Sequence, residues 1–169
     1  MRRLILLAAL VLLSAPGAAA AQVRLMAGVG LSTPIGDFGE VAEAGWHGMA
    51  GMQLGVPAIP IALRGEGAYH SFGAATGDPS SSILNGTLSL VFNLPGVGLV
   101  PYILGGVGTY RTSIDQAGIS ASSDSGFHGA FGVNIGALGF GGFGEVRLVN
   151  VSASSRDARF VTATLGLRL

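Results

Sequence analysis

Apolar and polar residues alternate one by one along most of this chain. In the stretch "LNGTLSLVFNL", which begins at Leu84, the leucines and the phenylalanine share one parity, whereas Asn85, Thr87 and Ser89 share the other. A period of two is that of a β-strand whose two faces meet different surroundings. A helix is disfavoured in another uncharged window, residues 125–144, because each of its eight glycines would cost a helix interior ~1 kcal/mol. The pattern therefore predicts strands.

Eight segments follow this alternation, and each is about ten residues long, the length at which a tilted strand crosses a bilayer. They span residues 22–33, 46–57, 60–72, 82–94, 100–112, 126–138, 141–151 and 158–169. The connectors after odd-numbered segments are long and those after even-numbered segments are short, as in residues 113–125 against residues 58–59. This rhythm is typical of outer-membrane barrels. The sequence predicts an all-β fold, an eight-stranded antiparallel up-and-down transmembrane β-barrel.

The larger apolar residues indicate which face of each segment meets lipid. In the fifth segment, this choice turns Val100, Tyr102, Leu104 and Tyr110 outward. An arginine on the lipid face would cost ~2–4 kcal/mol at the bilayer midplane. We therefore expect an apolar outer wall around a charged interior, or lumen, with only Arg159 outward. The charges predicted to point inward are Arg24, Arg64, Glu66, Arg111, Glu145, Arg147 and Arg168.

Two pairs of opposite charges are predicted to meet across the lumen. The third and seventh segments lie on opposite walls of an eight-stranded ring, and counting from the short turns places Arg64 level with Glu145, and Glu66 level with Arg147. An eight-stranded barrel is just wide enough for its side chains to fill it. Because buried charges are costly unless they are paired, we expect these four to form a lumen ion-pair network. The alternative is four separately solvated charges in a wet lumen.

Aromatic residues provide a second test of the membrane position. Outward aromatic residues are expected to gather at the two interfaces of the bilayer as girdles. The girdle near the long loops is predicted to comprise Trp46, Tyr69, Tyr110 and Phe127, and the girdle near the short turns Tyr102 and Phe92.

Composition agrees with a membrane protein and excludes several other classes. Charged residues are 11% of the chain, against a typical value of about 25%, so a water-soluble surface would be hard to build. The chain contains no cysteine, which excludes disulfides and thiolate metal sites. All basic residues are arginine, and beyond residue 21 seven of them stand against nine acidic residues, for a net charge of −2. That balance offers no basic surface for nucleic acid.

The first residues have the three parts of a secretory signal peptide. Arg2 and Arg3 precede an apolar run over residues 4–13, and small residues over 18–21 provide an A-x-A cleavage site. The apolar run is too short to span a bilayer, which takes ~20 residues. We therefore expect residues 1–21 to be removed and residues 22–169 to form a single barrel domain.

The signal peptide, the alternating strands, the inward Arg and Glu residues and the last segment "RFVTATLGLRL" together resemble the OmpA-type small outer-membrane β-barrel proteins, including the OmpX-like members. The resemblance covers residues 22–169. It implies a place in the outer membrane of a Gram-negative bacterium, contact with outer-membrane lipid and lipopolysaccharide, and a C-terminal strand that the barrel-assembly machinery reads. In the family this strand usually ends in an aromatic residue, whereas here it ends in Leu169.

Three histidines are the remaining candidates for chemistry. His47 and His70 are expected to be cross-strand neighbours pointing inward near the outer mouth, and His128 is expected at the same height. A metal-binding or proton-binding rim is one reading, since imidazole is the commonest metal ligand. We do not expect a metal, because strand spacing fixes no carboxylate beside them. Ser71 adjoins His70, but neighbours on a strand point to opposite faces and cannot form a dyad.

The sequence thus predicts an integral outer-membrane barrel with a structural or surface-interaction role, no cofactor, no catalytic residue and no nucleic-acid partner, acting as a monomer. The acidic external loops are read as solubilising, with a cation or protein partner as the alternative. The alternative function is an outer-membrane lipid-modifying enzyme, of the lipid A acyl hydrolase or transferase type. Such an enzyme would need a Ser, His and acid set on the outer rim, and no such set is seen.

Overall fold

The computed structural model is a closed β-barrel. It describes residues 22–55, 58–74, 80–114, 122–137, 140–152 and 157–169. Each strand pairs antiparallel with its neighbour in sequence, and the last strand closes the ring by pairing with the first. The predicted fold class is therefore confirmed. The strands are β1 (Gln22–Ile35), β2 (Ala42–Gly55), β3 (Ile61–Ala74), β4 (Ser81–Asn93), β5 (Leu99–Ile114), β6 (Ser122–Ala137), β7 (Phe140–Ser152) and β8 (Ala158–Arg168).

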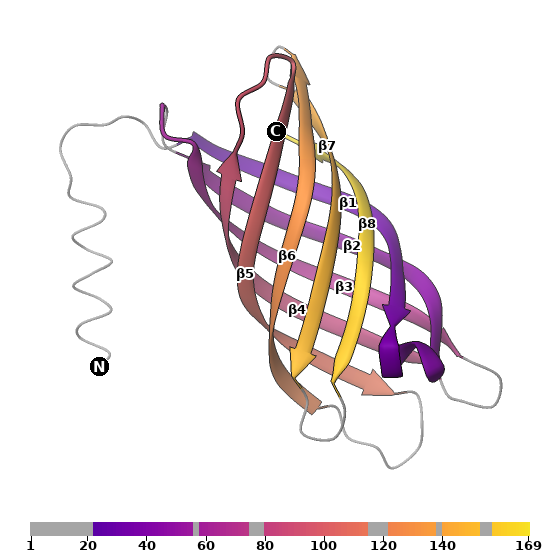
Figure 1. Cartoon of the computed structure of the whole chain (residues 1–169). Coiled ribbons are helices and arrows are strands. Elements are labelled where there is room, and N and C mark those ends of the chain that lie inside the picture. Colours follow the sequence, from indigo (N-terminus) through magenta and orange to yellow (C-terminus); the bar gives the residue numbers. More distant parts are fainter. Residues whose placement is uncertain (1–21, 56–57, 75–79, 115–121, 138–139, 153–156) are drawn as a thin grey trace, which may run out of the picture.

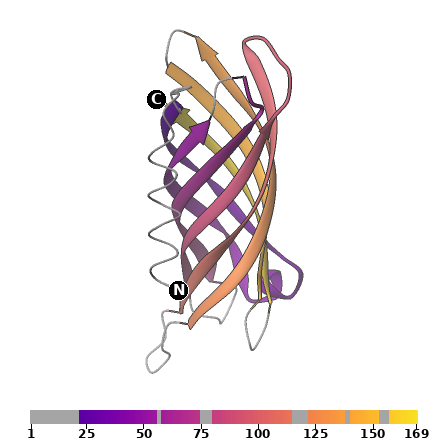
Figure 2. The same ribbon diagram turned by 90° about the vertical axis from the view of Figure 1, so that its left-hand side faces the viewer.

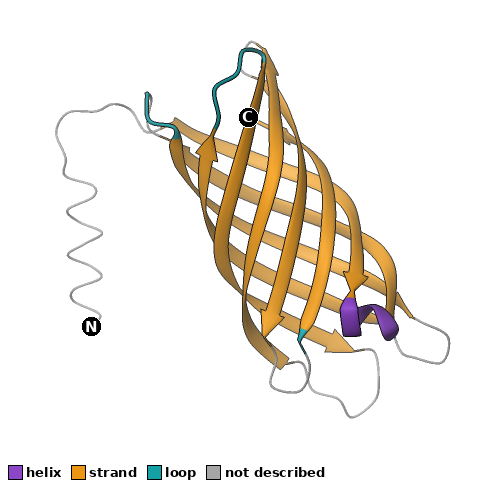
Figure 3. Cartoon of the chain, viewed as in Figure 1, coloured by secondary structure: helices purple, strands orange, loops and turns teal. Residues whose placement is uncertain are grey.

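The two ends of the barrel differ. The last residues of β2, β4 and β6 and the first residues of β3, β5 and β7 lie at one end, together with the C-terminus (Figure 1). A 3-10 helix, η1 (Gly36–Glu40), joins β1 to β2 at the opposite end (Figure 3). The strands are tilted against the barrel axis and continue around the far wall in the turned view (Figure 2). We call the two ends the short-turn end and the loop end.

The alternation along the sequence corresponds to the two faces of the barrel wall, one turned into the lumen and the other outward. Along β4, residues at odd positions such as Ile83, Ser89 and Val91 are buried, whereas Leu84, Leu88 and Leu90 are exposed. The outer wall is lined by large apolar side chains that no part of the described chain covers, and Val29 at its middle is 69% exposed. A soluble fold would bury such residues, because apolar surface is expelled from water. Further exposed members of this wall are Val23, Leu25, Leu31, Met52, Leu54, Ile61, Leu63, Phe131, Ile135, Val146, Leu148, Leu165 and Leu167.

Glycine makes the narrow lumen possible. At Gly30 of β1, a Cβ would collide with the main-chain carbonyl oxygen of Ala163 on β8 and would lie 2.7 Å from Cε1 of His47. On the outer wall the situation is reversed, since a Cβ at Gly48 or Gly86 would meet nothing within 4 Å. The inward glycines are therefore required by packing in this small ring, while these outward ones leave open notches in the wall.

The predicted orientation of the fifth segment is wrong. Tyr102, Leu104 and Tyr110 are buried in the lumen, and their neighbours Ile103 and Val107 face outward. Arg111, expected inside, is exposed on the outer wall. Both parities of β5 carry large apolar residues, so hydrophobicity alone did not distinguish its faces. Arg159 is exposed, as expected.

Strand boundaries near the loop end also differ from prediction. β1 runs on to Ile35, and β2 begins at Ala42, with a register irregularity between Glu43 and Trp46. The first long connection is therefore only η1 and Val41. No helix among the described residues has the length and apolar character needed to cross a membrane. The predicted signal peptide, residues 1–21, lies outside the described residues.

Candidate functional site

Three layers of side chains occupy most of the lumen, beside a smaller apolar cluster of Ala62, Val91, Tyr102 and Leu104. An ion-pair layer lies toward the short-turn end, a histidine layer follows, and an apolar cap closes the loop end. The side chains come from all parts of the ring, because alternate residues of every strand point inward. The ion-pair layer comprises Arg64, Glu66, Glu145 and Arg147 with Gln53 and Tyr102; the histidine layer comprises Ser32, His47, His70, Ser89, His128 and Thr164; and the apolar cap comprises Phe38, Ala42, Phe72, Ile83, Tyr110, Val149, Val151 and Phe160.

The structure brings the four predicted charges together across the axis. Arg64 on β3 donates from Nη1 to Oε2 of Glu145 on β7 at 2.7 Å. Arg147 on β7 donates from Nη2 to Oε2 of Glu66 on β3 at 2.7 Å. Arg147 also donates from Nη2 to Oε1 of Glu145 at 2.7 Å, and Nη1 of Arg64 lies 3.9 Å from Oε1 of Glu66. Both opposed pairs of the predicted lumen network are thus present in one connected cluster.

Glu145 is the centre of this cluster. Its carboxylate accepts hydrogen bonds from both arginines and from the hydroxyl of Tyr102, the last at 2.7 Å. Arg64 is 0% exposed and donates its other N–H groups to Oε1 of Gln53 at 3.1 and 3.2 Å. Its guanidinium also lies over the ring of Tyr102, 4.9 Å from the centroid. Two positive and two negative groups balance, so the cluster places no net charge in the barrel.

Tyr102 is the predicted girdle residue whose placement explains the β5 error. It is 0% exposed. In the lumen, its ring lies against the guanidinium of Arg64 and its hydroxyl donates to Glu145. Tyr110 is likewise buried, in the apolar cap. These two residues therefore do not belong to a girdle. Trp46 and Tyr69 are exposed on the outer wall with ring centroids 5.9 Å apart, and Phe127 is also exposed.

The histidine layer contains a serine that links two rings. His47 and His70 are paired directly across β2 and β3, and their ring centroids lie 5.1 Å apart. Oγ of Ser32 lies 3.0 Å from Nδ1 of His47 and 2.9 Å from Nδ1 of His70. His128 instead forms a hydrogen bond of 2.8 Å to Ser89. Within the described part of the chain, no group of three or more His, Asp or Glu side chains is arranged to hold a metal ion.

A serine beside a histidine is a possible nucleophile, but this one is sealed inside the barrel. Ser32 is 0% exposed, and none of the described carboxylates forms a hydrogen bond to His47 or His70. A hydrolytic serine needs a base that a third group orients and a path for the substrate. The third group at His47 is the hydroxyl of Thr164, at 2.9 Å from Nε2, and Ser32 is closed off from solvent, so among the described residues this layer has neither an orienting carboxylate nor an open path.

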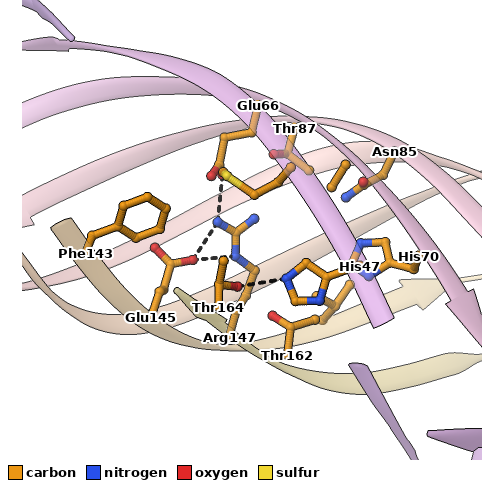
Figure 4. Close-up of a pocket in the computed structure, with 13 residues that line it drawn as sticks. His47, Glu66, His70, Asn85, Thr87, Phe143, Glu145, Arg147, Thr162 and Thr164 are labelled. Carbon is orange, nitrogen blue, oxygen red and sulfur yellow. Dashed lines mark hydrogen bonds and ion pairs between the residues drawn. The ribbon is translucent and has the colours of Figure 1, made fainter. Parts of the chain in front are cut away.

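A small cavity of about 20 Å³ separates the ion-pair and histidine layers (Figure 4). Arg147 lies between Glu66 and Glu145 on one side of it, with His47 and His70 on the other. Three buried oxygen atoms at its wall have no hydrogen-bond partner among the described residues: Oε1 of Glu66, Oδ1 of Asn85 and Oγ1 of Thr87. Buried polar atoms are normally satisfied, and the cavity has room for one or two water molecules, so we expect ordered water there.

The apolar cap closes the loop end. Phe38 of η1 turns into the barrel mouth, and its ring packs edge-on against Phe72 with centroids 5.2 Å apart. Phe160 contacts both Phe72 and His70, at 5.5 and 5.1 Å between centroids. Sequence reasoning missed this layer, since η1 was read as loop. The sequence did carry a signal for this cap, because the predicted alternation places three large apolar residues, Phe72, Ile83 and Val149, inward.

Comparison with known proteins finds similarity in structure alone. No protein-family model matches the chain, and no curated protein matches its sequence. The crystal structure of neisserial surface protein A, NspA, superposes with a TM-score of 0.74 at 12% identity, covering 87% of this chain and 96% of that one. Ail, the attachment invasion locus protein of Yersinia pestis, gives 0.60 at 13% identity, covering 88% and 99%. The N-terminal β-barrel domain of Pseudomonas aeruginosa OprF gives 0.54 at 12%, covering 88% and 98%.

Proposed function

Since the chain has the fold of the OmpA/OmpX-like small outer-membrane barrels, we propose that it is an integral outer-membrane barrel with a structural or surface-interaction role. The observation that carries the proposal is the distribution of polarity. The outer wall exposes large apolar side chains, while Arg64, Glu66 and Glu145 are buried in the lumen. A bilayer stabilises this arrangement, because lipid accepts the apolar wall and closure of the ring pairs every strand edge.

Surface interaction is the role that the architecture favours. The lumen is packed with side chains and capped by Phe38 and its neighbours, so the surfaces left for a partner are the outer wall and the two ends of the barrel. Two proteins of similar structure are named for the cell surface or for attachment, which agrees with this role. Further parts of the proposal are export through a cleaved signal peptide, recognition of β8 by the barrel-assembly machinery, and action as a monomer without a cofactor.

A lipid-modifying enzyme is the alternative, and comparison of lipid A distinguishes it. Mass spectra of lipid A from cells with and without the protein are expected to be identical. A change in acyl-chain number or length would support the enzyme instead, because such barrels act on the acyl chains of outer-leaflet lipid.

Membrane fractionation tests the location directly. The protein is expected in the outer-membrane fraction, resistant to extraction with alkaline carbonate. On an unboiled gel it should migrate differently from the boiled sample, because a closed barrel resists unfolding by detergent. A protein recovered in the soluble fraction, with a single gel position under both conditions, would contradict the proposal.

A pair of arginine substitutions on one strand separates a lipid-facing wall from a water-facing one. Val29→Arg at the middle of β1 is expected to destabilise the barrel in vesicles by about 2–4 kcal/mol, and Ile35→Arg at its loop end by at most about 1 kcal/mol. The measurement is urea unfolding in phospholipid vesicles, followed by gel mobility. In a water-facing wall both substitutions would be nearly neutral, so equal small effects would contradict the membrane assignment.

A further inference from the structure

Arg111 stands in an unusual place on the outer wall. It lies on β5 three residues before the strand ends at Ile114, at the loop end of the barrel, and its side chain is exposed. Its neighbours in register are Leu84 on β4 and Ser123 on β6. Among the described residues it forms no ion pair. A cation near the end of a membrane strand lies at the height of the lipid headgroups, where it costs almost nothing.

A groove in the wall begins at this arginine. It has a volume of about 300 Å³ and is lined by Leu84, Gly86, Thr109, Arg111 and Ser123 together with Asn85 and Tyr110. Gly86 creates the notch, because a Cβ there would meet nothing within 4 Å. Exposed Leu88 and Val107, which are paired across β4 and β5, continue the wall toward the middle of the barrel.

The chemistry of the groove changes along its length. At the loop end a guanidinium is combined with the hydroxyl-bearing residues Thr109 and Ser123, all exposed on the outer wall. Guanidinium is the group best suited to bind phosphate, through paired N–H donors, and hydroxyls add hydrogen bonds to sugar or phosphate oxygens. Leu84 lies level with Arg111, and the Gly86 notch lies level with Thr109, two residues closer to the middle. Beyond the notch, exposed Leu88 and Val107 offer an apolar surface for a chain. This order, charged head outside and apolar tail inside the bilayer, is that of a lipid.

We propose that the groove over β4, β5 and β6 binds a phosphorylated glycolipid of the outer leaflet, with its phosphate on Arg111 and one acyl chain in the notch at Gly86. The proposal rests on the proposed function, because it needs the loop end to face the outer leaflet. Charge complementarity selects the occupant, because a zwitterionic lipid would leave the guanidinium of Arg111 without a net anionic partner.

Lipid retention tests the charge. Wild-type protein is reconstituted in phosphatidylethanolamine vesicles that contain diphosphoryl lipid A, extracted gently, and examined by native mass spectrometry for bound lipid. Arg111→Gln is expected to reduce retention about fivefold, since one arginine near a charged lipid surface contributes ~1 kcal/mol. Arg159→Gln is the matched control, because Arg159 is also exposed but lies beside Ile35 and Asn150 on another wall. Equal retention by the two variants would overturn the proposal.

Lipid variants test the headgroup. Wild-type protein should retain the same glycolipid without phosphates about fivefold less than the phosphorylated form. Arg111→Gln should retain the two forms equally. If phosphatidylglycerol is retained to the same extent as diphosphoryl lipid A, the site recognises any lipid phosphate and the choice of a glycolipid is wrong. Equal retention of the phosphorylated and dephosphorylated forms would show binding by acyl chains alone and overturn the role of Arg111.

Filling the notch at Gly86 tests whether an acyl chain of the lipid binds there. Gly86→Leu places a side chain where there is open space, so the barrel should fold, yet lipid A retention should fall severalfold. Gly48→Leu is the control, as its Cβ also meets nothing within 4 Å on the wall of β2. Each variant is first checked for a heat-dependent gel position. Wild-type protein that fails to insert would overturn the proposed function, whereas inserted variants with unchanged lipid retention would overturn the groove alone.

Discussion

Replacing Glu145 with glutamine will destabilise the folded barrel by about 3–5 kcal/mol, the usual consequence of removing one partner from a buried ion pair. The substitution keeps the size of the side chain but removes the charge that faces two arginines. Arg64, which is 0% exposed, would lose its carboxylate partner at 2.7 Å, and the hydroxyl of Tyr102 would lose its charged acceptor. Glu66 alone would then balance two buried guanidinium groups. The change should appear as a lower urea midpoint in vesicles.

Trp46 provides a convenient signal for this measurement, since it is the single tryptophan of the chain and lies on the outer wall. Glu43→Gln is the matched control: Glu43 is exposed on β2 and should tolerate the change within about 0.5 kcal/mol. A double variant, Arg64→Met with Glu145→Gln, restores charge balance. It should be less destabilised than the two single effects added together. Wild-type stability in Glu145→Gln would instead indicate four independently solvated charges.

Gly30→Val will prevent the barrel from closing. The added side chain would collide with the carbonyl oxygen of Ala163, which belongs to the main chain of β8 and cannot rotate away as a side chain can. It would also press on the ring of His47 at 2.7 Å from its Cβ. Overpacking of this kind costs typically 1–3 kcal/mol where side chains can move, so a clash with main chain at the β1 and β8 seam should cost ~3 kcal/mol or more.

The expected observation is loss of the heat-dependent gel position after refolding into vesicles. Gly65→Val is the control, because a Cβ at Gly65 on the outer wall of β3 would meet nothing within 4 Å. It adds the same atoms and the same preference for strand. A Gly30→Val variant that refolds like Gly65→Val would show that the ring is wider at this level than the structure indicates.

Most of the architecture could be predicted because lipid and lumen impose a strict alternation on each strand. The period of two located all eight strands, and counting residues from the short turns located Arg64 across from Glu145. The ion-pair cluster could be predicted because β3 and β7 face each other in an eight-stranded ring and the short turns give a common starting point for counting height. Sequence could not supply Gln53 or Tyr102, since their role depends on the height at which neighbouring strands align.

The errors have a common physical origin. The prediction assumed that the inside is polar throughout, but the loop end is filled by an apolar cap. In β5, Tyr110 belongs to that cap and Tyr102 donates to Glu145, so the parity with more aromatic residues is the inner one. The same reasoning led to the wrong prediction that Arg111 points inward. Phe38 was overlooked because a lone aromatic residue in a connection has no period from which its partners can be found.

The seam between β1 and β8 has a consequence for protein engineering. Leu25 and Leu169 exchange two main-chain hydrogen bonds, at 3.0 and 2.9 Å, so the first residues of β1 and the end of β8 lie side by side at the short-turn end. A few flexible residues could join them, and new termini could then be cut in another connection. Such a circular permutant would keep every strand pair of the ring while moving the free ends to the opposite end of the barrel. It would thereby provide a way to display a fused peptide there.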